Sequence, residues 1–368
     1  MGESVPRPVS RELVEAIQSV EVTHADEGRS GFQIIFRVGR RDRGDLAEYR
    51  LLANPIFKVF SRVTLVVTLG AAAQVLIDGV ITNQQLAPNP EPGKTTLTLT
   101  GEDISVMMDL EQRSLEHKAQ DEASIAEMIL RQYKNYGIEP QVIKPTHIDR
   151  PTGSERIPVQ QGTDLAYLRQ IGQRFAHVFY IIPGQSMGTS IAYWGPPQRQ
   201  TQPQKTLTVN MGSFTNVRSI NFQYNGMSAT RLEGSAQDRR TNEIRSVRED
   251  RSDRPPLSQF PALGNQRHYR VTQFRQTGRD TAQAGARAQA EADRSVDNVV
   301  TASGELDTVH YGSVLKLRGL VGLRGVGHSY DGLYYVKRVS HRISPGQYQQ
   351  SFTLTREGLV STKQRLAV

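Results

Sequence analysis

The chain has 368 residues, no cysteine and a formal net charge of +8. The length allows two to four domains, and the absence of cysteine excludes disulfides, thiol catalysis and thiolate metal sites. No apolar run reaches the about 18 residues of a membrane-spanning helix, and the first residues lack the apolar core of a signal peptide. We therefore expect a protein that folds in a cytoplasm and has no stable membrane anchor.

The positive charge is dispersed along the chain. A dedicated nucleic-acid site needs a concentrated basic stripe, ideally with interleaved aromatic residues. The densest basic run, at residues 239–254, instead alternates with Glu243, Glu249, Asp250 and Asp253. The composition therefore predicts solubility and contacts with acidic partners, and no specific nucleic-acid binding.

Alternating apolar and polar residues predict a first antiparallel β-barrel or sandwich over residues 15–112, after a terminal arm at residues 1–14. In residues 63–69, for example, every second side chain is valine or leucine, as in a sheet with one buried face. Strands are expected at residues 19–24, 32–38, 63–69, 74–82 and 95–100, with a charged loop at 39–44.

The apolar residues then recur at helical spacing, which predicts an α+β domain over residues 113–205. Ser124 and Glu127 form a capping box that would start one helix, and Gly137 fits a C-terminal cap. An apolar stripe predicts a second helix at residues 164–176. Two strands would follow, at residues 178–182 and 189–194.

A second, discontinuous barrel is expected from residues 206–235 and 311–360, with a C-terminal tail at 361–368. Residues 236–310 would form an insertion between its two parts. The polar, proline-broken start of this insertion predicts a mobile surface loop as far as residue 265. The other expected elements are strands at 206–209, 216–224, 228–233 and 268–275 and an alanine-rich helix at 281–294.

An Asp-Gly hairpin pattern occurs twice in the chain. The first copy comprises residues 63–69, Asp78-Gly79, Pro92-Gly93 and 97–102, and the second comprises 314–318, Asp331-Gly332, Pro345-Gly346 and 352–357. A segment that is repeated once at long range predicts a duplicated domain, not a solenoid. Its recurrence assigns Asp78 and Asp331 to tight turns or bulges, and Pro345-Gly346 to a type II turn.

Three histidines near Asp331 are conceivable metal ligands: His310, His328 and His341. His341, however, lies at strand spacing from Val339, which favours a packed or hydrogen-bonded histidine. We therefore assign no metal ligand.

The glycines of the stretch that precedes Asp331 fit neither a phosphate loop nor a dinucleotide fingerprint, because Tyr330 occupies the place of the third glycine. Sheet bends and close backbone approach at a subunit contact are expected instead, so no cofactor-binding residue is assigned. The glycines concerned are Gly319, Gly322, Gly325 and Gly327.

The acids Glu102, Asp103 and Asp109 are conceivable as the paired carboxylates of a glycoside hydrolase. A role in capping and solvating the turn after the first barrel is expected instead. No Ser–His–Asp group stands out, so no catalytic residue is assigned.

Several segments resemble the phage late control gene D protein family. They are residues 99–109, the helix at Ser124, residues 162–168, 325–341 and 348–358. The resemblance spans roughly residues 15–360 and is diffuse but ordered along the chain. The family contains baseplate hub proteins of contractile phage tails and injection particles, and the hub half of type VI secretion spike proteins.

The resemblance implies a mainly β fold with α+β insertions. Two homologous tube-like antiparallel β-barrels per subunit would form a pseudo-sixfold ring in a homotrimer. One end of the ring would meet the tail tube protein and the other a trimeric spike, among other baseplate proteins. Because the sequence ends soon after Gly358, without an oligonucleotide-fold barrel or β-helical repeat, we expect the spike to be a separate protein.

The leading hypothesis is therefore a non-enzymatic, trimeric hub without cofactors. It would be assembled in the cytoplasm as part of a phage virion or contractile injection particle. A tail-associated cell-wall hydrolase is the alternative, and a nucleic-acid-binding module is a weaker one.

Overall fold

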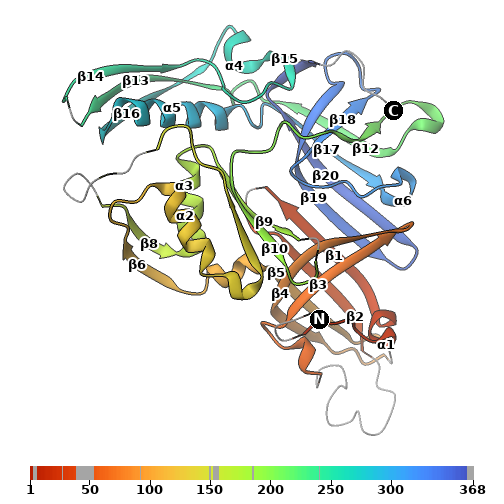
Figure 1. Ribbon diagram of the computed structural model, residues 1–368. Coiled ribbons are helices and arrows are strands. Elements are labelled where there is room, and N and C mark those ends of the chain that lie inside the picture. Colours follow the sequence, from red (N-terminus) through yellow and green to blue (C-terminus); the bar gives the residue numbers. More distant parts are fainter. Residues whose placement is uncertain are drawn as a thin grey trace.

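The computed structural model describes the chain except residues 3–5, 27, 39–53, 92, 149–150, 152–156, 185, 240 and 363–368. An 11-stranded sheet dominates it, accompanied by two three-stranded and two two-stranded sheets (Figure 1). The expected mainly β architecture with α+β insertions is confirmed. The predicted charged loop at residues 39–44 lies outside the described residues.

The first half of the large sheet has the strand order β1-β2-β5-β4-β3, and every pairing is antiparallel. The N-terminal arm lies along β3, where Gly2 and Arg62 exchange two backbone hydrogen bonds. Short helices precede β1 and β3. The bounds are α1 Arg11–Glu15, β1 Ile17–Ala25, β2 Gly31–Arg37, η2 Pro55–Phe57, β3 Arg62–Leu69, β4 Ala72–Ala87 and β5 Thr96–Asp103.

The second half repeats this order as β12-β17-β20-β19-β18. A short helix, α6, follows β17 just as η2 follows β2. A further strand, β11, pairs with β18 in parallel. The bounds are β11 Gln204–Thr208, η5 Gly212–Phe214, β12 Val217–Tyr224, β17 Val300–Asp307, α6 Thr308–Tyr311, β18 Leu320–Arg324, β19 Gly332–Ser344 and β20 Gln347–Arg356.

The two halves also share local irregularities. In each half the first strand has a register shift near its start, and the long hairpin strand has a second shift in its interior. Each half also stacks an aromatic ring over a cross-strand glycine. A Cβ at Gly101 would lie 2.2 Å from Cζ of Phe32, and one at Gly304 would lie 2.7 Å from Cζ of Phe352. Larger residues are therefore excluded at both glycines.

The hairpin pattern does not map onto the structure as simply as expected. Asp78 lies inside β4 and not in a turn. Its carboxylate pairs with Arg62 on the neighbouring strand β3 at 2.6 Å. Asp331 does lie in a turn, where Oδ1 accepts from the amide of Val326. The expected strand at residues 314–318 is wrong, since Arg318 adopts φ +61° and the strand begins at Leu320.

The predicted turn between β19 and β20 is present. Ser344 pairs with Gln347, and Gly346 has φ +80°, as a type II turn requires.

The expectation of closed barrels is not met within one chain. Among the described residues no pairing joins β3 back to β1 or β12 back to β18, so β3 and β12 end the main run of strands and β11 forms a further edge beside β18.

An antiparallel ladder between β1 and β19 joins the two halves into one sheet. It runs from the pair Val20–Ile343 to the pair Ala25–Arg338. We call this ladder the seam. Thr23 and Ser340 share a hydroxyl hydrogen bond of 2.7 Å across it.

An α+β unit lies beside the seam (Figure 1). Helices α2 and α3 pack with the sheet β7-β10-β9 around the fully buried Trp194, whose indole donates to the carbonyl of Leu168 at 3.0 Å. The bounds are η3 Ile104–Met108, β6 Gln112–Glu116, α2 Glu122–Arg131, η4 Lys134–Tyr136, β7 Ile138–Val142, β8 Val159–Thr163, α3 Asp164–Gln173, β9 Val178–Pro183 and β10 Ser190–Gly195.

The capping box expected at Ser124 is wrong, because helix α2 begins about one turn earlier. Asp121 is the N-cap of α2, because its carboxylate accepts both the amide and the hydroxyl of Ser124. Glu127 pairs instead with Arg131 along the helix surface. Gly137, at φ +72°, ends the short helix η4.

The segment expected as a mobile loop up to residue 265 is largely structured. Strand β14 pairs with β13, and β13 pairs with β16, to form a sheet that one side of α5 covers (Figure 1). Alanines allow the close approach: Ala284, Ala288 and Ala292 are buried with Leu232 and Val247. The bounds are β13 Thr230–Asp238, β14 Ile244–Glu249, β15 Ser258–Pro261, α4 Ala262–Asn265, β16 Arg270–Arg279, α5 Thr281–Ser295 and β21 Gly358–Ser361.

This sheet changes the expected distribution of strands. The strand predicted at residues 228–233 lies in β13 and pairs with β14 and β16, not with the second half of the large sheet. Strand β17, which the sequence placed in the insertion, pairs with β12 and β20 of the large sheet. Strand pairing between distant segments decides both positions.

The two halves differ in one buried charge. Glu357 carboxylate oxygens accept from the amides of Leu257 and Ser258 at 2.6 and 2.7 Å and pair with Arg199 at 3.3 Å. The strand registers place Thr355, and not Glu357, at the position of Glu102 in the first half. Glu102 is half-buried and pairs with Arg29 at 2.8 Å. The buried anchor at Glu357 is thus a feature of the second half.

We expect Glu357→Ala to lower the free energy of unfolding by about 3–5 kcal/mol, because it leaves a buried guanidinium and two amides without their acceptor. The control Glu127→Ala removes a glutamate that pairs with Arg131 on the surface of α2, and it should cost less than about 1 kcal/mol. Urea denaturation followed by circular dichroism measures both. Equal losses in the two variants would contradict this account.

Candidate functional site

The large sheet has one continuous polar face that crosses the seam. Successive cross-strand partners form one row of side chains on this face: Ser219, Glu305, Ser351, Ser340 and Thr23. A second row comprises Asp307, Gln349, Arg342, Glu21, Gln33, Thr100 and Asn83. All of these side chains are exposed or half-buried.

The opposite face of the same strands is apolar and buried, with Val22, Ile34, Leu99, Phe352 and Leu354 among its residues. The strict alternation explains why the hydroxyl and amide side chains gather on one side. The polar side chains of β5 and β20 follow this alternation, and each of Thr96, Thr98, Gln349, Ser351 and Thr353 is exposed or half-buried.

The polar face carries charges of both signs. Arg37, Arg338 and Arg342 lie on it with Glu21 and Glu305, and Arg342 comes within 3.9 Å of Glu21. A hollow of about 420 Å³ lies over β12, β17, β19 and β20. This hydroxyl-rich surface with mixed charge offers no large apolar area to bury.

Two histidines lie at the seam. His341 is buried and its Nδ1 is 2.8 Å from the hydroxyl of Tyr348. Its ring meets that of His24 edge-on, with 5.4 Å between centroids. Burial lowers the pKa of His341 to about 4. Burial, and then the nearby His341 and Arg318, lower the pKa of His24 to about 3.

The structure does not bring the three candidate histidines together as a metal site. His310 Nε2 contacts the carbonyl of Thr215 at 2.9 Å, and His328 is exposed in the turn before β19. Among the described residues no group of three or more histidine, aspartate or glutamate side chains is arranged to hold a metal ion.

The candidate acids have structural partners. Asp103 caps the helix η3 and accepts from the amides of Ser30 and Ser105, both at 2.9 Å. Glu102 and Asp109 both pair with Arg29, at 2.8 and 3.2 Å. These contacts correspond to the capping role that the sequence favoured.

The glycine-rich stretch makes its close approach within the chain. A Cβ at Gly325, which has φ +91°, would lie 1.8 Å from the carbonyl oxygen of Val209 beyond β11. Gly319 lies against the side chain of Gln204. At these glycines the close approach joins the segments of β11 and β18.

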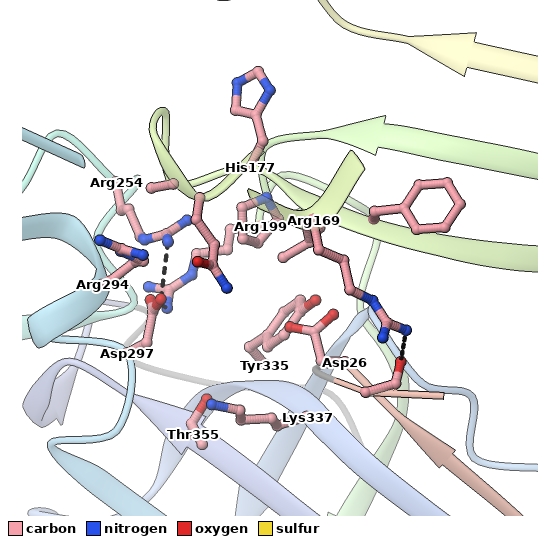
Figure 2. A pocket seen from close by; sticks show the side chains of 16 residues that line it. Asp26, Arg169, His177, Arg199, Arg254, Arg294, Asp297, Tyr335, Lys337 and Thr355 are labelled. Atoms are coloured by element: carbon pink, nitrogen blue, oxygen red, sulfur yellow. Dashed lines mark hydrogen bonds and ion pairs between the residues drawn. The ribbon is translucent and has the colours of Figure 1, made fainter. Parts of the chain in front are cut away.

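A cavity of about 280 Å³ lies where the large sheet, the α+β unit and α5 meet. Figure 2 shows Arg254, Arg294 and Asp297 on one side, Asp26 and Tyr335 in the middle, and Arg169 on the other side. We call it the junction cavity. Its further charged or polar lining residues are Gln173, His177, Arg199, Lys337 and Thr355.

Ion pairs line one side of the junction cavity. Asp297 pairs with Arg199 at 2.6 Å and with Arg254 at 2.8 Å. Burial nevertheless raises the pKa of Asp297, against the opposing effect of these two arginines. Burial likewise raises the pKa of Asp26, although Arg318 lies 3.4 Å from its carboxylate.

Sequence reasoning did not find the junction cavity. Its residues come from seven separate parts of the chain and follow no motif spacing. Only the abundance of arginine in polar segments hinted at it.

No helix within the described part of the chain combines the length and apolar character needed to cross a membrane.

Comparison with solved structures gives the class of fold. The chain is similar to a tail protein from Neisseria meningitidis MC58, with a TM-score of 0.65 and 12% identity over 94% of this chain and 93% of that one. It is also similar to the 43 kDa tail protein of prophage MuSo2 from Shewanella oneidensis, with a TM-score of 0.63 and 12% identity over 93% and 94%.

A third similar structure is the E. coli c3393 protein, a component of the type VI secretion system. It is described as structurally similar to the T4 tail proteins gp27 and gp5. The TM-score is 0.59 with 11% identity, over 96% of this chain and 75% of that one. No protein-family model and no curated protein sequence matches the chain.

These findings confirm the resemblance to phage tail and baseplate hub proteins at the level of the fold. The likeness extends over nearly the whole chain and over nearly the whole of two tail proteins. The protein therefore has the fold of a structural tail or baseplate component.

We expect the stability of the fold to fall in mild acid because of His341. Its folded-state pKa of about 4 lies below the ordinary value of 6.5, so the stabilisation is complete above pH 6.5 and is lost as the pH falls toward 4. Between pH 7 and pH 5 this residue should cost about 2 kcal/mol of unfolding free energy. Urea denaturation at each pH measures the slope.

The variant His341→Gln should lose less unfolding free energy between pH 7 and pH 5. The slope of its unfolding free energy against pH should correspond to about one bound proton fewer than in the wild type. Its stability at pH 7 provides the baseline for comparison. If the wild type and the variant lose stability equally between pH 7 and pH 5, the assignment to His341 is incorrect.

Proposed function

We propose that the protein is a structural baseplate hub of a contractile phage tail or contractile injection system. In this proposal it acts as a trimeric adaptor between a hexameric tail tube and a trimeric spike. One observation carries the proposal: two halves of one sheet have the same strand order and the same bulges. Three chains would then present six similar units.

The outer strands suggest how such a ring closes. Strands β3 and β12 end the main run of strands in the large sheet. The N-terminal arm pairs with β3 at Arg62, and the remaining unpaired edge groups favour pairing with another chain. Exposed apolar side chains gather near both ends. Phe60, Val66 and Met187 lie by β3, with exposed fractions of 50%, 46% and 64%. Near β12 the corresponding residues are Phe214, Tyr224 and Met227.

A contact between β12 of one chain and β3 of the next joins two different surfaces. Repeated three times around an axis, such a heterologous contact closes into a ring without free edges. An apolar hollow of about 570 Å³ beside Leu65 and Val67, under the N-terminal arm, would be covered by the neighbouring chain.

The polar face would then line the lumen of the ring. Hydroxyl and amide side chains with balanced charge let a channel stay hydrated and avoid adhesion of what passes through it. The α+β unit and the layer of β13, β14, β16 and α5 would lie outside the ring and meet other baseplate proteins. The particle would be assembled in the cytoplasm, without a membrane anchor or a specific nucleic-acid site.

A non-enzymatic role agrees with the structural tail proteins that share the fold. The acids that a cell-wall hydrolase would use are committed to caps and ion pairs. A peptidoglycan zymogram of the purified protein should therefore stay blank, and a cleared band would favour the hydrolase.

The oligomeric state tests the proposal. Size-exclusion chromatography with light scattering should give three times the chain mass of 41.1 kDa. Val66→Asp at one end of the sheet, or Tyr224→Asp at the other, should shift the protein to monomer, because each places a charge in an apolar contact.

The matched control is Val271→Asp on β16. Val271 is 48% exposed, like Val66, but lies outside the large sheet, so the trimer should persist. A second measurement applies if the trimer forms only together with other baseplate proteins. A map of the assembled particle should then show threefold hub density. A monomeric hub in that map would overturn the proposal.

A further inference from the structure

The junction cavity lies among three parts of the molecule that the hub function leaves without a chemical role. Strands β19 and β20 contribute Tyr335, Lys337 and Thr355, and the α+β unit contributes Arg169. Arg294 comes from the end of α5. A molecule bound here would contact all three parts at once.

The carboxylates that line the cavity already have cationic partners. Asp297 is held by Arg199 and Arg254, and Asp26 is held by Arg318. A third carboxylate, Glu357, lies behind Arg199 at 3.3 Å.

Two guanidinium groups remain without a carboxylate partner. Arg169 donates to the carbonyl of Gly28 at 2.7 Å, and among the described residues neither Arg169 nor Arg294 lies within ion-pair distance of an acid. Figure 2 shows these two arginines on opposite sides of the cavity. Burial lowers the pKa of Arg169, although Asp103, Asp109 and Glu102 oppose the shift from a distance.

One buried donor also lacks an acceptor. The Nε of Arg199 has no hydrogen-bond partner, although this residue is only 4% exposed. Buried donors are almost always satisfied in native proteins, by protein, water or a ligand. The hydroxyl of Tyr335 faces the carboxylate of Asp26, and burial together with this carboxylate raises its pKa. Nδ1 of His177 has no hydrogen bond, but its ring points away from the group in Figure 2.

We propose that the junction cavity is a binding site for a small, multiply charged oxyanion, such as a phosphate or a compact polycarboxylate. The anion would accept a hydrogen bond from Nε of Arg199 and would neutralise Arg169 and Arg294. Charge-assisted hydrogen bonds to guanidinium groups are the strongest available to such a ligand. Because it binds the folded chain at the meeting point of three parts, the anion would stabilise their arrangement.

Isothermal titration of the intact chain with inorganic phosphate and, separately, with citrate tests the site, against sodium chloride at matched ionic strength. We expect one bound anion per chain. Arg169→Gln and Arg294→Gln should each weaken binding about tenfold, since each removes one charged contact. The control Arg245→Gln removes an exposed arginine on β14 that pairs with Glu243, and it should change the affinity by less than twofold.

Circular dichroism of each variant checks that the fold is retained, and a selenate soak of crystals locates the anion by its anomalous signal. Binding of phosphate alone, or of citrate alone, supports the site and identifies the oxyanion class. The proposal is overturned if neither anion binds beyond chloride, if all three variants bind equally, or if the selenate peak lies elsewhere. None of these results depends on whether the protein forms a trimer.

Discussion

The seam between β1 and β19 is the contact on which the rest of the structure depends. Without this ladder each half would be a separate five- or six-stranded sheet with two additional edges. Arg318 secures it from one end: its guanidinium donates to the carbonyl of Ala25, lies 3.4 Å from Asp26 and stacks 3.7 Å above the ring of Tyr180. One side chain therefore ties the seam to the α+β unit.

The left-handed backbone at Arg318 belongs to the same constraint. A positive φ is uncommon outside glycine and costs energy. Here it ends the irregular segment that precedes β18 and aims the guanidinium across the seam. The two seam histidines lie on the buried side of the same ladder, so an acid-sensitive element sits at the join between the two halves.

The two halves show how one topology serves two environments. Glu357 follows the last strand of the second half and is buried, whereas Glu102 lies inside β5 of the first half, is half-buried and pairs with Arg29. The difference arises because residues 257–261 and β21 cover the second half. Insertions between repeated strands therefore adapt each half, while strand order and the polar face stay common to both.

Alternation of apolar and polar residues, helical stripes and turn glycines determined most strands, the helices α2, α3 and α5, and the turn at Gly346. Strong local patterns of this kind depend only on neighbours in sequence. They also predicted that His341 is packed and that Asp103 caps a turn, because both roles involve residues a few positions away.

Only the tertiary structure decided which strands pair across long sequence distances. The position of β13 in the outer sheet, the seam, and the place of Asp78 inside β4 all depend on partners that no local pattern identifies. The same holds for the junction cavity, whose charges come together from segments as distant as Asp26 and Thr355. Burial and pairing energies are set by the whole fold, and sequence spacing does not encode them.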